Sequence, residues 1–153
     1  MSFEITQDID RPPARVFAFV ADVTTMPRWY EAVVRVEPAD PVGPGARFRM
    51  VRSLPAGPAH NDVEVVTWVP DEEITFVSVA GPTPFRYRYR FAPTATGTRL
   101  TLEGRISAEG LTGPAGRLGG LAERFFKQGM KTNLRALARL LESATPAGAI
   151  RSH

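Results

Sequence analysis

Few side chains in this sequence combine chemical reactivity with an informative position. His60 is the only histidine before the C-terminal residue, and histidine is the residue whose ordinary pKa lies closest to neutrality. It follows the proline- and glycine-containing segment 53–59, which predicts a loop. Tyr87 and Tyr89 carry hydroxyls that donate hydrogen bonds or carry protons. His60 and Tyr89 are therefore candidate catalytic residues; the alternative is an incidental loop histidine and tyrosines that only line a wall.

Composition excludes several classes of protein. The 153 residues are 43% hydrophobic and 23% charged, which is typical of one soluble globular domain. No stretch approaches the roughly 18–20 apolar residues of a membrane-spanning helix, and the N-terminus lacks a secretory signal, so we expect a cytoplasmic protein without stable membrane insertion. With no cysteine and two histidines, the chain is expected to hold no disulfide, metal or cofactor. A net charge of +3 is a weak argument for a polyanionic partner, and we expect no nucleic-acid binding.

Hydrophobic periodicity predicts the elements that would position these residues. Alternation over residues 3–9 indicates a strand, and Pro12 and Pro13 then start a helix that ends near Asp22. A second short helix is predicted over 25–30. Strands follow over 33–36, 46–52, 62–69, 74–79, 85–91 and 98–106, and a long helix over 114–143. This order predicts an α+β domain over 1–144 with a tail at 145–153.

Two segments define the apolar surfaces. Alternation over 85–91 places four aromatic rings on one face and three arginines on the other, where Glu103 of the next strand could pair with an arginine. The last helix would cover the apolar face of the sheet. At 100° per residue its inward arc holds Leu118, Ala122, Phe126, Gly129, Met130, Asn133, Leu137 and Leu140, and the opposite arc holds Arg117, Arg124, Lys127, Lys131, Arg135 and Glu142.

Two residues of the helix favour a hollow between the helix and the sheet, and one strand residue is expected at its edge. Gly129 lies in the arc although glycine costs about 1 kcal/mol of helix stability, and Asn133 lies there although a buried amide needs a partner. Arg52 shares its strand face with Phe48 and Met50, where it could anchor a carboxylate or an enolate. The alternatives are that Gly129 admits an aromatic ring, that Asn133 bonds a strand-end carbonyl, and that Arg52 is exposed at a strand end.

The opening of the chain resembles a known superfamily. Segment 11–22, with Pro13, Val16, Phe17 and Val20, is followed by Met26-Pro27-Arg28-Trp29, by Gly45 before the third strand, and by the long terminal helix. This pattern is similar to the START-like helix-grip superfamily (SRPBCC), in particular to its bacterial polyketide cyclase/dehydrase and coenzyme Q-binding branches. The likeness covers about residues 3–143.

The resemblance implies a curved antiparallel sheet of about seven strands that wraps around the C-terminal helix, with two short helices after the first strand. It also implies an apolar internal cavity that binds a small hydrophobic molecule such as a lipid, polyketide or quinone. Separately, we expect a monomer or homodimer. The residues expected to line it are Trp29, Phe48, Met50, Arg52, Phe85, Tyr87, Tyr89, Phe126, Gly129, Met130 and Asn133.

Two other functions remain open at this stage. The first is a polyketide cyclase or dehydratase that uses the same cavity, with His60 or a tyrosine moving protons. The second is a nonenzymatic module that binds a partner through Arg86, Arg88 and Arg90. Trp29 and Tyr30 are expected either at an entrance lid or in the packing of the short helices.

Overall fold

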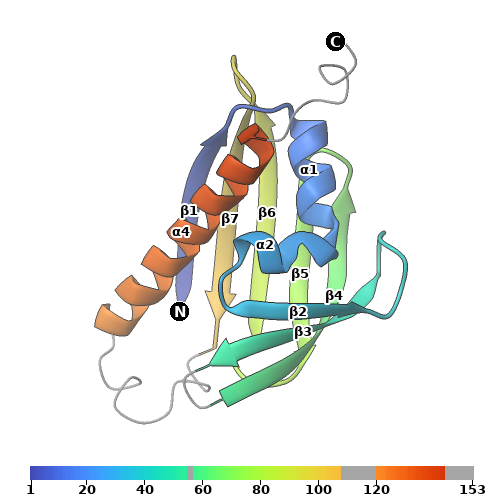
Figure 1. The fold of residues 1–153 in the computed structure, drawn as a ribbon, viewed down its shortest axis with the longest axis vertical. Helices are drawn as coiled ribbons and strands as arrows, with labels where there is room; N and C mark the ends of the chain where they lie inside the picture. Colours follow the sequence, from blue (N-terminus) through green and yellow to red (C-terminus); the bar gives the residue numbers. More distant parts are fainter. Residues whose placement is uncertain (55–56, 108–119, 144–153) are drawn as a thin grey trace.

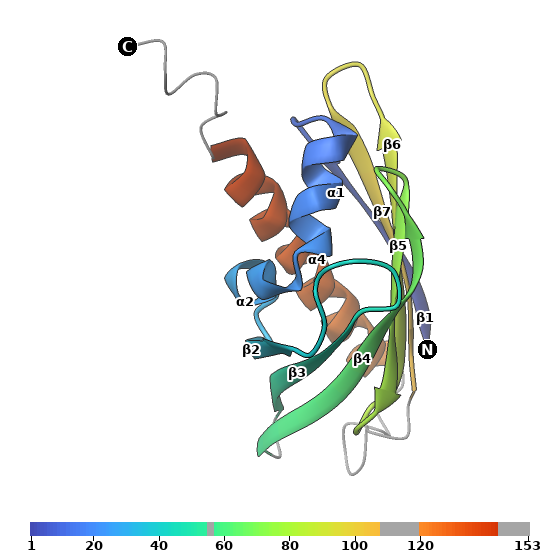
Figure 2. The same cartoon turned by 90° about the vertical axis from the view of Figure 1, so that its right-hand side faces the viewer.

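A computed structural model describes residues 1–54, 57–107 and 120–143. Seven antiparallel strands form one sheet in the order β1-β7-β6-β5-β4-β3-β2. The sheet curves around α4, and the helices all lie on its concave face (Figure 1 and Figure 2). The predicted α+β helix-grip architecture is confirmed.

In chain order the described elements are β1 (Ser2–Ile9), α1 (Pro13–Ala21), the 3-10 helix η1 (Val23–Thr25), α2 (Met26–Trp29), β2 (Val33–Pro38), β3 (Arg47–Leu54), β4 (Gly57–Val69), β5 (Glu73–Ala80), β6 (Phe85–Pro93), β7 (Thr98–Ile106) and α4 (Gly120–Ser143).

The alternation in β6 and β7 decides which face of the sheet is buried. The four aromatic residues of β6 are all buried, whereas its three arginines are exposed or half-buried. In β7, Leu100, Leu102 and Ile106 are buried on the same side. Because successive strand residues point to opposite faces, the alternation in the sequence identifies the face of the sheet that is buried against the helices.

β4 is longer than its sequence predicts. The segment expected to be a loop before residue 62 continues the strand back to Gly57, and His60 pairs with Val51 of β3. The prediction of a loop at His60 was wrong, because a hairpin with β3 overrides the turn propensity of Pro58.

α4 covers the sheet with a buried stripe slightly rotated from the predicted one. Met130, Leu134, Leu137, Ala138 and Leu141 are all buried, whereas Gly129 is exposed. The predicted helical residues 114–119, which include Leu118 and Arg117, lie outside the described part of the chain. No helix within that described part is both long and apolar enough to cross a membrane.

Candidate functional site

A pocket of about 470 Å³ opens where the first half of α4 faces the ends of β2 and β3. The turn between α2 and β2 contributes Tyr30, Glu31 and Ala32, and β3 contributes Arg52 and Ser53. The helix contributes Phe125, Phe126, Gly129, Met130 and Asn133. Its volume lies within the usual range of small-molecule sites, roughly 300–1,000 Å³.

Gly129 makes the helix side of the pocket open. A Cβ built on this residue would meet no atom within 4 Å. No aromatic ring of the described residues therefore lies against this glycine, in contrast to one alternative from the sequence. Phe126 and Met130 lie on either side of it along the pocket wall, and Phe125 nearby is 70% exposed. Helix α4 thus offers apolar surface with free space in front of it.

Arg52 is the positively charged residue on the wall opposite α4. The residue is only 4% exposed, which contradicts the alternative of a solvent-exposed strand end. Its Nε and Nη2 atoms donate to Asn61 Oδ1 at 3.0 and 2.7 Å, and Nη2 also donates to the carbonyl of Pro82 at 3.0 Å. The guanidinium lies 5.6 Å from the centre of the Phe85 ring. All of these partners are neutral, and no carboxylate of the described residues forms an ion pair with Arg52.

Asn61 holds this arginine in place, and sequence reasoning missed it. Its side chain is fully buried, and its Nδ2 donates to the Pro82 carbonyl at 2.7 Å and to Ser78 Oγ at 3.3 Å. Gly81 allows the approach: with φ of +112°, it has no room for a Cβ, which would lie 2.3 Å from the His60 carbonyl oxygen. Only the pairing of β4 with β3 reveals this cluster, because Asn61 lies in the segment predicted to be a loop.

Tyr30 connects the pocket to the interior. Its hydroxyl donates to the hydroxyl of Tyr87 at 3.4 Å. Burial raises the pKa of Tyr30 above its ordinary value and that of Tyr87 further still, although the nearby charge of Arg52 lowers both. Both phenols therefore stay protonated at neutral pH and can act as hydrogen-bond donors.

Asn133 lines the pocket with its amide partly satisfied by the protein. Its Oδ1 accepts a hydrogen bond from the backbone N–H of Glu31 at 3.2 Å, which ties α4 to the turn after α2. Its Nδ2 has only the weak acceptor Met130 Sδ, at 3.6 Å. The alternative of a bond to a strand-end carbonyl is wrong, because the Nδ2 donor contacts the Met130 sulfur instead.

The structure separates the predicted ligand-contacting residues into two groups. Arg52, Phe126, Gly129, Met130 and Asn133 come together at the pocket. The others are buried in the hydrophobic core and do not line it, and they are Trp29, Phe48, Met50, Phe85, Tyr87 and Tyr89.

Aromatic packing explains why those side chains fill the deep interior. Phe76 contacts both Phe48 and Tyr89 edge-on at 5.8 Å, and Phe85 stacks on Tyr87 at 4.5 Å. The indole of Trp29 packs edge-on against Tyr89. The pocket at α4 thus lies at one end of the helix–sheet interface, outside this aromatic core.

The two candidate catalytic residues do not meet in the pocket. The side chain of His60 is exposed on β4, and Tyr89 is buried in the core. Neither belongs to the pocket wall. Tyr30, which does line it, was noted in the sequence only as part of an entrance or of helix packing.

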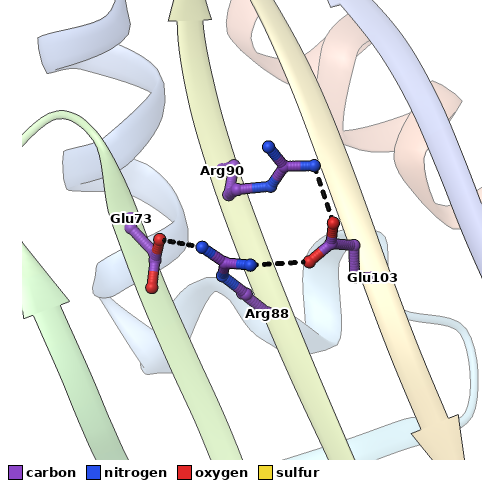
Figure 3. A network of polar contacts seen from close by, with 4 residues as sticks. All are labelled: Glu73, Arg88, Arg90 and Glu103. Carbon is purple, nitrogen blue, oxygen red and sulfur yellow. Dashed lines mark hydrogen bonds and ion pairs between the residues drawn. The ribbon is translucent and has the colours of Figure 1, made fainter.

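The outer face of the sheet carries a network of ion pairs. Arg88 donates to Glu73 at 2.7 Å and to Glu103 at 3.0 Å, and Arg90 donates to Glu103 at 2.7 Å (Figure 3). The predicted pairing of Glu103 with an arginine is confirmed. A hollow of about 680 Å³ lies over these strands and is larger than the pocket at α4. Its walls carry mostly charged side chains, with acidic and basic residues in equal number. Two of the three arginines proposed for partner binding are thus already paired.

Comparisons with known proteins agree with the fold. The sequence model of the family described as "Polyketide cyclase / dehydrase and lipid transport" matches residues 1–142. A search of curated proteins found no match. Among solved structures, a protein from Thermus thermophilus, TTHA0849, superposes with a TM-score of 0.80 at 21% identity, covering 95% of this chain and 100% of that one.

Two di-domain ARO/CYC proteins are also similar in fold. BexL, from the BE-7585A biosynthetic pathway, gives a TM-score of 0.70 at 22% identity, and StfQ, from the steffimycin pathway, gives 0.71 at 18%. The matches cover 95% and 92% of this chain and about half of each relative, 51% and 50%. The chain thus corresponds to one domain of these two-domain proteins.

Proposed function

Because the chain belongs to the polyketide cyclase/dehydrase and lipid transport family, we propose that it binds a small, largely apolar molecule in the pocket between α4 and the ends of β2 and β3. The open space in front of Gly129 is the observation that carries the proposal. A helix glycine that touches nothing lowers stability without improving packing, so its place beside Phe126 and Met130 favours a role in admitting a ligand.

The size of the pocket sets the scale of the affinity. A ligand that buries about 300 Å² of apolar surface gains about 7.5 kcal/mol at 25 cal/mol per Å². Association costs at least about 4 kcal/mol of that in lost translational and rotational freedom. Apolar contact alone therefore gives weak binding, and tight binding needs polar groups on the wall such as Arg52, Tyr30 and Asn133.

Fluorescence of N-phenyl-1-naphthylamine, a neutral apolar dye, tests the proposal. Gly129→Phe should fill the pocket and weaken dye binding at least about tenfold, because its ring occupies the ligand space. Gly129→Ala is the matched control and should bind like the wild type, since a single methyl leaves most of the pocket free. Unchanged binding by Gly129→Phe would show that the dye binds elsewhere, and no binding by the wild type would contradict the proposal.

The enzymatic alternative has less support from this geometry. A cyclase or dehydratase needs groups that move protons beside the substrate, and neither His60 nor Tyr89 lines the pocket. Besides Arg52, the titratable residues on the described part of the wall are Tyr30 and Glu31. A binding function needs only the apolar wall and one or two polar contacts, and both are present.

A further inference from the structure

The pocket contains a buried positive charge that no carboxylate of residues 1–54, 57–107 or 120–143 neutralises. Arg52 is almost fully buried, and its hydrogen bonds all go to the neutral oxygens of Asn61 and Pro82. A buried charge without a counter-ion is costly to desolvate, so buried arginines are normally paired with carboxylates. By contrast, the half-buried Arg88 and Arg90 of the outer face each pair with a carboxylate.

One nitrogen of the guanidinium is free to bind a ligand. Nη1 of Arg52 has no hydrogen-bond partner among the described residues. The fully buried side-chain atoms that lack a partner are in other residues, so Nη1 retains some solvent exposure. Arg52 itself lines the pocket, so a ligand held there lies close to this side chain. Asn61 and the Pro82 carbonyl fix the orientation of the group, so a ligand need not order it on binding.

We propose that the ligand is an amphiphile whose carboxylate binds Arg52 Nη1 while its apolar part lies along Phe126, Gly129 and Met130. This inference rests on the proposed function and names the ligand class. The charge count favours a monoanion over a phosphate: Arg52 is the sole cation on the described part of the wall, and Glu31, at the exposed rim, adds a negative charge. A carboxylate matches one guanidinium, whereas a dianion would need further cations.

Decanoate and decan-1-ol test the inference, because they share a chain and differ in the charged group. Each is titrated at neutral pH as a competitor of N-phenyl-1-naphthylamine. The wild type should bind decanoate at least about tenfold more tightly than the alcohol, the factor expected for one charge-assisted hydrogen bond. Arg52→Gln should abolish this preference without changing the affinity for the alcohol. Arg86→Gln, the same change at an exposed arginine of the outer face, should leave the preference intact.

Equal affinity of the wild type for acid and alcohol would overturn the inference, and this comparison needs no variant. A preference that persists in Arg52→Gln, or in the apolar replacement Arg52→Met, would also overturn it. If the dye and the alcohol bind and are excluded by Gly129→Phe, but the acid shows no advantage, only the carboxylate assignment fails. If none of the three probes binds, the proposed function fails as well.

Discussion

Replacing Gly129 by alanine should stabilise the protein. The residue lies inside α4 with a helical backbone, and its added Cβ would contact nothing within 4 Å. Alanine is therefore expected to gain the full difference in helix propensity, about 1 kcal/mol in the free energy of unfolding. For a domain of this size that corresponds to a rise of about 2–4 °C in Tm.

Urea denaturation followed by circular dichroism measures this change directly. The midpoint should rise with an unchanged m-value, because the surface exposed on unfolding hardly differs. Gly104→Ala is the matched control: its Cβ would lie 2.1 Å from Cζ of Phe3, which is itself packed against Phe126. That variant should lose about 1–3 kcal/mol through overpacking. If Gly129→Ala is destabilised as well, the space in front of this glycine is filled, and the argument for a pocket there fails.

Three further predictions concern the polar groups. All three tyrosines of the chain are buried, and burial raises their pKa values, so tyrosinate absorbance at pH 10 should be lower in the native protein than in the unfolded chain. The free energy of unfolding should decrease as the pH rises through this range, because the unfolded chain releases protons that the native state retains. Asn61→Leu should cost about 1–3 kcal/mol in urea denaturation because it removes an acceptor from the buried Arg52; a smaller loss would show that water or another group replaces the amide. Glu103→Gln should cost less than about 1 kcal/mol, with an effect that shrinks in high salt, because its pairs with Arg88 and Arg90 are partly exposed. A large, salt-independent loss would contradict the last estimate.

Strand alternation made most of the fold predictable. In 85–91 every second residue is aromatic, so one register alone buries the rings, and a neighbouring strand can then be assigned its inner face. The terminal helix was predictable for the same reason, but its buried stripe was misplaced by about one residue. Periodicity determines the existence of an apolar face more reliably than its exact rotation against a curved sheet.

The site was predictable only in part, because its key contacts join residues from different elements. Arg52 was identified from strand parity, yet its burial depends on Asn61 in β4 and on a carbonyl in the turn at 81–84. Local sequence cannot show that two such segments meet. The aromatic residues of β6 were assigned to a ligand cavity because a sequence pattern does not distinguish a ring that lines a hollow from a ring that fills one.

The position of β1 at the edge of the sheet has a consequence for biosynthesis. Within the sheet this strand pairs only with β7, and the register joins Ser2 to Arg105. A ribosome adds about 5–20 residues per second, so the first strand emerges about 5–20 s before its partner has been made. Throughout that interval its backbone groups lack their native partner, so β1 is the segment where a nascent chain of this protein is most open to a chaperone or to mispairing with another chain.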